Sequence, residues 1–199
     1  MMIKVLLFFA ALPVFGDVFN FQANRMATNS AAGKELTVLS GDAFVRSDTL
    51  FLKADRIELY GNDNQFIECM GHVSGREEEK DITFQTDWIS YDRITKMIRM
   101  EGNALLEDKK NNIIARSRFI EYDDANEIAV FQVAVRLFKD TMVCRSEYAV
   151  YQRAAGFLTL SGFPVVYKQS DEFRADRIQV NLDTDEVNME GSVSGAIKD

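Results

Sequence analysis

The sequence predicts an all-β protein, an open (semi-closed) β-jellyroll in which stacked antiparallel hairpins form two facing sheets around an apolar trough. Three observations predict this fold class. A strand–turn–strand pattern returns about every thirty residues, apolar and polar residues alternate inside each copy, and no stretch shows sustained helical spacing. With 199 residues and 47% hydrophobic content, the chain can bury one sizeable core.

The first element along the chain is a short apolar segment. Residues 1–16, "MMIKVLLFFAALPVFG", combine one lysine, an apolar run and small residues before Asp17, which is the pattern of a secretory signal peptide. The run is shorter than the roughly 18 residues that indicate a membrane span, and an uncleaved N-terminal anchor is the alternative. We expect a signal peptide at 1–16 and one exported β domain at 17–199.

The repeated unit is clearest in "TDWISYDRITKMIRMEGNA", residues 86–104, where two strand-like halves surround a polar turn. Similar copies start at Ala54, Ser117, Ser146 and Ala175. Five glycines and one valine anchor the pattern, at Gly41, Gly71, Gly102, Val133, Gly162 and Gly191. These positions are separated by 30, 31, 31, 29 and 29 residues. A unit with this period stacks on its neighbours, because one hairpin cannot bury its apolar face alone.

The strands and their connections follow from the pattern inside each unit. Alternating apolar residues precede and follow the turns "GNDNQ", "DRITK", "DDANE", "QRAAG" and "DTDE", whose side chains can satisfy their own backbone. The apolar parity switches across Asp55, with Leu52 and Ala54 before it and Ile57 and Leu59 after it. We therefore expect the chain to bend there and pass to a second sheet, as strands do at bulges and corners.

Acidic residues recur at these expected bends, and they allow two interpretations. The recurring residues are Asp55, Asp87, Glu147 and Asp176. A row of carboxylates could bind Ca²⁺, but the spacing matches no calcium loop. We therefore predict corner caps, bonded to backbone N–H groups or to arginines such as Arg56 and Arg177, and no metal site.

The cysteines, the histidine and the overall charge limit the possible functions. Cys69 and Cys144 occupy apolar columns of the repeat, so we expect two buried thiols and no disulfide. His72 is the only histidine, and no catalytic or phosphate-binding motif occurs, so no enzyme activity and no cofactor are expected. The formal charge of -8 has no basic patch in the sequence to offset it, which argues against nucleic acid and anionic lipid surfaces as partners.

Three phrases in the chain resemble one known family. The phrases "TVLSGDAFVRSDTLFLKADRIELY", "YDRITKMIRMEGNALLED" and "VNMEGSVSG" are similar to the LptA/OstA family of periplasmic lipopolysaccharide transport proteins, in which a hydrophobic-x-Gly step precedes an "ADxI" strand. The resemblance spans about residues 21–195. The middle unit departs from the pattern, because Arg118 and Val133 stand where Asp and Gly are expected. We expect this unit to bend less sharply.

The resemblance implies a function as well as a fold. Members of the family shield the acyl chains of the lipid inside an open jellyroll and join end to end into a bridge between membranes. For this chain it implies a lipid-binding trough lined by Ile57, Leu59, Ile67, Ile89, Tyr91, Ile98, Met100, Ile120, Phe131, Leu158, Leu160, Ile178 and Met189. It also implies strand edges for joining at Phe19, Phe21, Val187, Met189 and Val193.

Three functions remain open at this point. The first is a non-enzymatic periplasmic carrier or bridge that passes lipopolysaccharide or a related glycolipid from the inner to the outer membrane, with LptC-like and LptD-like jellyroll proteins and further copies of itself as partners. A membrane-anchored LptC-like role is a variant of it. The second is a self-assembling β scaffold. A fully packed core would favour the scaffold, whereas a wide gap between the sheets would favour the carrier. The third is a sugar-active enzyme, which would need two facing carboxylates in a cleft.

Overall fold

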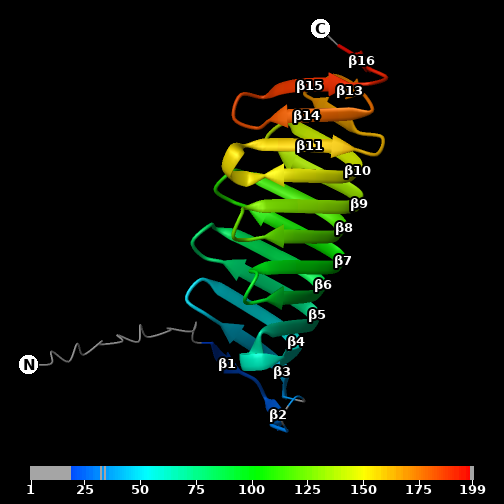
Figure 1. Cartoon of the computed structure of the whole chain (residues 1–199). Coiled ribbons are helices and arrows are strands. Elements are labelled where there is room, and N and C mark those ends of the chain that lie inside the picture. Colours follow the sequence, from blue (N-terminus) through cyan, green and yellow to red (C-terminus); the bar gives the residue numbers. More distant parts are fainter. Residues whose placement is uncertain (1–18, 32, 34, 198–199) are drawn as a thin grey trace, which may run out of the picture.

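The computed structural model describes residues 19–197 except 32 and 34, so the expected signal peptide at 1–16 lies outside the described residues. In the described part, sixteen strands form one hydrogen-bonded sheet. Two single-turn 3₁₀ helices, η1 (Asn62–Asn64) and η2 (Arg153–Ala155), lie in its loops. The strands stack nearly in chain order, with β1 (Asn20–Gln22) at one end and β15 (Glu186–Glu190) at the other (Figure 1). The predicted all-β class is confirmed.

Eight long strands form the centre of the stack. They are β3 (Leu36–Arg46), β4 (Leu50–Tyr60), β5 (Phe66–Glu77), β6 (Ile82–Asp92), β7 (Met97–Asp108), β8 (Ile113–Asp123), β9 (Ile128–Lys139) and β10 (Met142–Gln152). Each pairs antiparallel with the next, and the register of every pair shifts near its middle. A bulge of this kind bends the strand. Each long strand therefore contributes one half to each of two layers.

We call these halves layer A and layer B. Layer A contains residues 36–40, 56–60, 66–70, 88–92, 97–101, 119–123, 128–132 and 148–152, extended by β2 (Arg25–Asn29), β11 (Phe157–Ser161), β14 (Arg177–Asn181) and β15. Layer B contains residues 43–46, 50–54, 73–77, 82–86, 104–108, 113–117, 135–139 and 142–146, extended by β1, β12 (Val165–Lys168), β13 (Asp171–Arg174) and β16 (Ser194–Ala196). The two facing sheets expected from the sequence are thus two layers of one bent sheet.

The core lies between the layers along the whole stack. Alternate residues of each layer point inward and form one continuous cluster of buried side chains. The Phe84 ring of layer B and the Tyr122 ring of layer A meet across it, with centroids 6.0 Å apart. The layers join at the bends along one side, and the hairpin turns of both layers lie along the other side, which we call the mouth.

The bends depend on left-handed backbone conformations. Gly71 and His72 have φ angles of +74° and +44°, and Val133 and Ala134 have angles of +66° and +56°. The register shift between Arg116 and Phe119 matches that of the other strand pairs. The prediction that the middle unit bends less sharply is therefore wrong. Neighbouring strands impose the bend on Val133, although a β-branched residue is disfavoured in this conformation.

Recurring carboxylates cap the bends, as predicted. A side-chain oxygen of Asp87 accepts the Asn103 backbone N–H at 3.2 Å, and an oxygen of Asp176 accepts the Ser192 backbone N–H at 3.1 Å. Glu147 likewise accepts the Ala134 N–H at 3.2 Å.

The remaining acid and the two arginines behave differently. Asp55 contacts the imidazole Nδ1 of His72 at 2.7 Å. Arg56 and Arg177 are not the partners of the capping carboxylates, since Arg56 bonds Glu58 and Arg177 lies 3.8 Å from Glu190. Glu58, on the same strand as Arg56, and Glu190, on the strand opposite Arg177, lie nearer to these guanidinium groups than the corner carboxylates do.

Both cysteines are buried free thiols, as the sequence predicted. Cys69 lies on the inner face of layer A and Cys144 on the inner face of layer B. Burial raises the pKa of each thiol to about 12. At neutral pH both side chains are therefore neutral, apolar core groups.

Candidate functional site

The predicted trough residues form one wall of the interior. All thirteen lie on the inward face of layer A, in strands β4 to β9, β11, β14 and β15. All except Met189 are buried, and Met189 is partly buried against the same cluster. The structure therefore brings the predicted set together, while their contact with a lipid stays a prediction.

The predicted set of trough residues omits the opposite wall. The inward side chains of layer B include Val45, Leu52, Phe84, Leu106, Leu137 and Val166. The sequence carries a signal for this wall in the alternating apolar residues beyond the anchor positions, such as Val45, Leu106 and Leu137. The interior has two apolar walls of similar composition.

The two walls are in contact in the middle of the stack. Tyr122, Phe84, Phe131 and Met100 are among the largest side chains of the core, and each is less than 2% exposed. Dense packing of this kind excludes a wide gap there. A lipid chain can enter the central part only if the layers separate.

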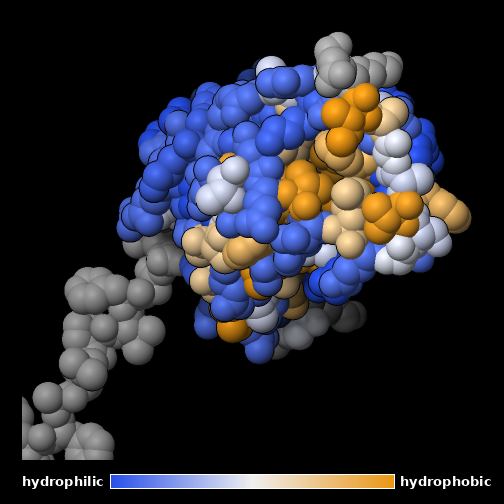
Figure 2. Space-filling model, turned by 90° about the horizontal axis from the view of Figure 1, so that it is seen from above, coloured by the Kyte–Doolittle hydropathy of each residue, from blue (hydrophilic) through white to orange (hydrophobic). Residues whose placement is uncertain are grey.

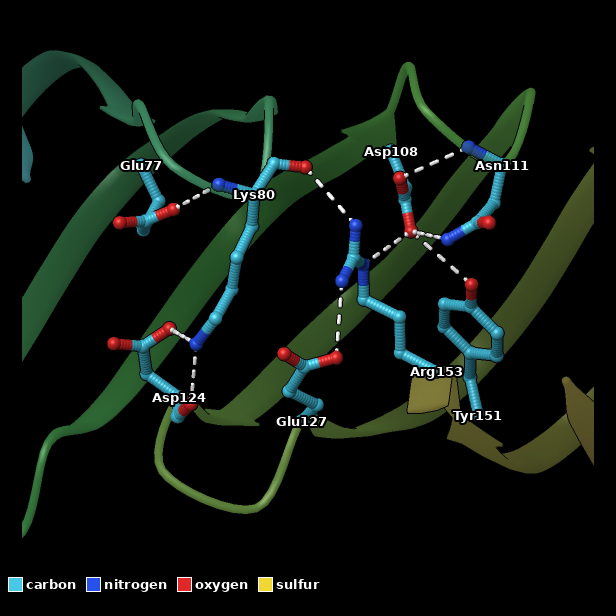
Figure 3. Close-up of polar contacts among 8 residues, drawn as sticks. All are labelled: Glu77, Lys80, Asp108, Asn111, Asp124, Glu127, Tyr151 and Arg153. Carbon is cyan, nitrogen blue, oxygen red and sulfur yellow. Dashed lines mark hydrogen bonds and ion pairs between the residues drawn. The ribbon is translucent and has the colours of Figure 1, made fainter. Parts of the chain in front are cut away.

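A polar network holds the mouth closed at this central part (Figure 3). The Lys80 ammonium, from a turn of layer B, bonds both the side chain and the backbone carbonyl of Asp124, from a turn of layer A. The Arg153 guanidinium, also from layer A, donates to Asp108 of layer B at 2.8 Å and to the Lys80 carbonyl at 3.0 Å. Its remaining contact is with Glu127 at 2.9 Å. We call these five residues the mouth latch.

The centre of the mouth latch is dry. The side chain of Asp108 is 0% exposed and that of Arg153 is 8% exposed. Asp108 also accepts hydrogen bonds from the Tyr151 hydroxyl at 3.1 Å and from the Asn111 side-chain amide at 2.7 Å. A buried ion pair with this many hydrogen bonds fixes the separation of the two layers.

Contacts across the mouth are weaker toward the ends of the stack. Near the C-terminal end, the Lys168 ammonium donates to the Asp185 carbonyl at 3.1 Å, and side chains of this pair are 33% and 48% exposed. Near the N-terminal end, the Arg93 guanidinium lies over the Phe19 ring, 4.4 Å from its centroid. The exposed Lys168–Asp185 contact contributes little to stability, and the cation–π contact between the half-buried Arg93 and Phe19 contributes about 1–2 kcal/mol at most.

Clefts reach the interior at both ends. The N-terminal cleft, of about 320 Å³, is lined by Phe19, Phe21, Leu59, Ile67 and Arg93, with Asp63 and Asn64. The C-terminal cleft, of about 340 Å³, is lined by Phe173, Val187 and Met189, with Lys168, Gln169, Asp171 and Asp185. Figure 2 views the C-terminal end and shows hydrophobic residues gathered inside a hydrophilic surround. Three predicted trough residues, Leu59, Ile67 and Met189, thus line accessible clefts.

The residues predicted for joining lie in or beside strands at the two ends of the stack. Within residues 19–197, strands β1, β2, β15 and β16 each have a hydrogen-bonded neighbour on one side only. Phe21 is in β1, Val187 and Met189 are in β15, Phe19 precedes β1, and Val193 precedes β16. Phe21 is 46% exposed and Val193 is 53% exposed. The structure adds β2 and β16 to these edges, while the joining itself stays a prediction.

These features define a class of protein: an unclosed β-jellyroll with an apolar interior, clefts at both ends and strands with one unpaired edge at each end. In the described ranges no cluster of His, Cys, Asp or Glu could hold a metal ion. A search of the helices in those ranges also finds none that is both long and apolar enough for a membrane span.

The chain belongs to the OstA-like protein family, whose model matches residues 17–189. This match confirms the resemblance seen in the sequence. Among solved structures, the chain is similar to LptH from Pseudomonas aeruginosa, described as the LptA-homologous periplasmic component of a lipopolysaccharide transport device. The identity is 9%, the alignment covers 92% of this chain and 96% of LptH, and the TM-score is 0.28. A search of curated proteins finds no match.

Proposed function

We propose that the protein is a non-enzymatic periplasmic carrier that shields lipopolysaccharide or a related glycolipid and passes it from the inner toward the outer membrane. One observation carries the proposal: the apolar interior of an OstA-like sheet is accessible through a cleft at each end. An acyl chain that enters such a cleft exchanges water for apolar walls, which contributes about 25 cal/mol per Å² of buried area.

The cleft residues indicate how a lipid would lie. At the C-terminal cleft, Phe173, Val187 and Met189 offer an apolar floor, while Lys168 stands at the rim. Acyl chains would lie on the floor, and an anionic headgroup would remain outside beside the lysine. In the proposed carrier, a longer part of each acyl chain would enter the interior only when the two layers separate along the mouth.

The bridge part of the proposal uses the edge strands, which have a hydrogen-bonded neighbour on one side only. A neighbouring jellyroll can add a strand to β15 or to β1 through main-chain hydrogen bonds, which joins the two interiors. The proposed neighbours are further copies of this chain and LptC-like and LptD-like jellyroll proteins. Joining would also cover Phe21 and Val193, which are exposed in the single chain.

The first experiment is mass spectrometry of the lipids extracted from the protein, purified under mild conditions from its own periplasm. We expect a stoichiometric glycolipid. Met189→Glu places a charge on the cleft floor and should abolish its recovery, whereas Asn188→Glu places the same charge on the exposed face of β15 and should retain it. Equal recovery from both variants, with both folded, contradicts the carrier proposal.

The same sample tests localisation. A mature mass that begins at Asp17 supports cleavage of the signal peptide and a periplasmic protein. An intact N-terminus that fractionates with membranes supports the membrane-anchored LptC-like alternative instead.

A self-assembling scaffold is the second candidate, and the packed centre of the interior favours it. Such a protein would use its edges without opening its core. A lipid-free protein that forms end-to-end oligomers is the outcome expected from this candidate. A sugar-active enzyme has less support, because the buried carboxylate Asp108 is engaged by Arg153, Tyr151 and Asn111.

A further inference from the structure

Three arginines lie side by side on the outer face of layer B. Arg116 of β8 is directly opposite Arg136 of β9, and Arg136 is directly opposite Arg145 of β10. All three side chains are exposed. Like charges in directly opposite positions destabilise a sheet. The arrangement therefore has a cost in the unliganded protein.

These arginines lack the carboxylate partners that several other surface arginines have. Arg46 lies 3.0 Å from Glu78, and Arg99 lies 3.1 Å from Glu121. Within residues 19–197, no carboxylate comes within ion-pair distance of Arg116, Arg136 or Arg145, and Arg145 is instead 5.5 Å from the centroid of the Tyr167 ring. The chain carries a net charge of -8, so this local excess of positive charge is exceptional.

A fourth arginine completes the group at the bend. Arg118 occupies the repeat position where Asp87 stands in the preceding unit, so the sign of the charge is reversed there. Because Arg118 cannot accept a hydrogen bond, the Ala134 N–H at this bend is capped by Glu147 of the following strand. The sequence offered no basic patch, and that expectation is wrong, because separate strands bring these residues together.

The group surrounds a cleft of about 640 Å³. Its lining includes Arg116, Arg118 and Arg136, with hydrogen-bonding groups from Gln85, Asn103 and Ser117. Asp87 also lines the cleft, but one of its oxygens is occupied by the Asn103 N–H. A second cleft, of about 240 Å³, continues past Arg136 to Arg145 and Glu147. Arg136 thus belongs to both clefts.

We propose that this arginine cluster, Arg116, Arg118, Arg136 and Arg145, binds a phosphate-class anion: a diphosphate or a phosphate monoester carried on a larger molecule. Guanidinium groups bind phosphate oxygens in a bidentate manner, and strands about 4.8 Å apart place two such groups within reach of one phosphate. The cleft is larger than a single phosphate, which favours a diphosphate or a sugar phosphate. The site is separate from the apolar interior and does not depend on the carrier function.

The test uses the whole mature protein and two probes that distinguish the sources of the anion. Inorganic pyrophosphate is titrated by calorimetry at constant ionic strength, and phosphatidylcholine vesicles with and without phosphatidic acid are used in a flotation assay. Arg136→Gln should weaken binding about tenfold or more. Arg99→Gln, which removes an exposed, paired arginine from layer A, should leave it unchanged.

Each outcome decides the proposal. Arg136-dependent binding of pyrophosphate assigns a soluble phosphate compound, and Arg136-dependent flotation only with phosphatidic acid assigns a lipid headgroup. Binding of neither probe at millimolar concentration, or equal binding by Arg136→Gln, overturns the proposal. A second readout needs no ligand: Arg136→Gln should keep or raise the thermal midpoint, because it removes repulsion across the strands. The glycolipid recovered from the interior should be unchanged in this variant, so failure here leaves the carrier proposal untouched.

Discussion

Removal of Arg153 is the sharpest test of the mouth latch. We consider Arg153→Met, which keeps an unbranched side chain of similar reach and removes the guanidinium. The substitution breaks the ion pair with Asp108, the contact with Glu127 and the hydrogen bond to the Lys80 carbonyl. Layer A then loses its main polar attachment to layer B at the centre of the mouth.

The magnitude follows from what remains around Asp108. Breaking a fully buried ion pair on one side costs about 3–5 kcal/mol. Asp108 keeps the Tyr151 hydroxyl and two donors of Asn111, so the cost lies at the lower end of that range. Glu127 is 28% exposed and can be rehydrated, so its lost contact adds little. We expect the free energy of unfolding to fall by about 3 kcal/mol.

The assay is equilibrium unfolding in urea, followed by the fluorescence of Trp88, the only tryptophan. Arg99→Met is the matched control, since its partner Glu121 is exposed, and it should cost less than about 1 kcal/mol. The double variant Arg153→Met/Asp108→Leu should recover only part of the loss, because it removes the buried charge but leaves the Tyr151 hydroxyl and the Asn111 donors without their acceptor. A loss below about 1 kcal/mol for Arg153→Met would refute the latch.

Three further predictions concern the bends and the thiols. Gly102→Ala should lower the unfolding free energy by about 2–4 kcal/mol, because the added Cβ would collide with the capping carboxylate of Asp87 and the backbone has a φ of +107°. Val133→Gly should raise the unfolding free energy by about 1 kcal/mol, because glycine adopts the left-handed conformation without strain. Cys69 and Cys144 should resist a thiol reagent at pH 8 until the protein unfolds, since a pKa of about 12 leaves about a thousandfold less thiolate than an ordinary thiol. His72 should titrate above its usual pKa, because its hydrogen bond and charge contact with the corner carboxylate favour the imidazolium.

The controls separate these effects from general loss of structure. Urea unfolding measures the two bend variants, and an unchanged unfolding free energy in Gly102→Ala would contradict the role of the carboxylate at that bend. Both thiols should react after unfolding in urea, and rapid reaction in the native state would show that the core opens. The raised folded pKa of His72 means that its contribution to stability is present below the unfolded pKa and is lost as the pH rises through the folded pKa. Nuclear magnetic resonance titration of His72 should show the shift disappear in Asp55→Asn.

The sequence could predict the fold because each unit repeats the same local information. Alternation placed Ile98 and Met100 on an inward face, and the parity switch at Asp55 located a bend. The opposite wall of the trough carries the same signal, in alternating apolar residues beyond the anchor positions such as Leu106 and Leu137. The bend at Val133 was missed because a residue preference is weaker than the register imposed by two paired strands.

Sites that join distant residues carried no comparable signal. Lys80 and Asp124 are forty-four positions apart, and Arg153 and Asp108 are forty-five apart, in turns that look like ordinary solvated loops. Their meeting depends on how the layers close, which no single unit encodes. The arginine cluster has the same cause, since Arg116, Arg136 and Arg145 become neighbours only through strand register.

The distribution of contacts across the mouth sets a direction for any opening. The central Arg153–Asp108 pair is buried, whereas the Lys168–Asp185 contact near the C-terminal end is largely exposed. Breaking the polar contacts across the mouth therefore costs several kcal/mol at the centre and about 1 kcal/mol or less at that end. The two layers should begin to separate at the ends of the stack, where the clefts already lie and where the edge strands would meet a neighbouring jellyroll. In the proposed carrier, lipid would therefore enter where the chain is joined to another protein, and the centre would stay closed until entering acyl chains replaced the contacts between the two walls.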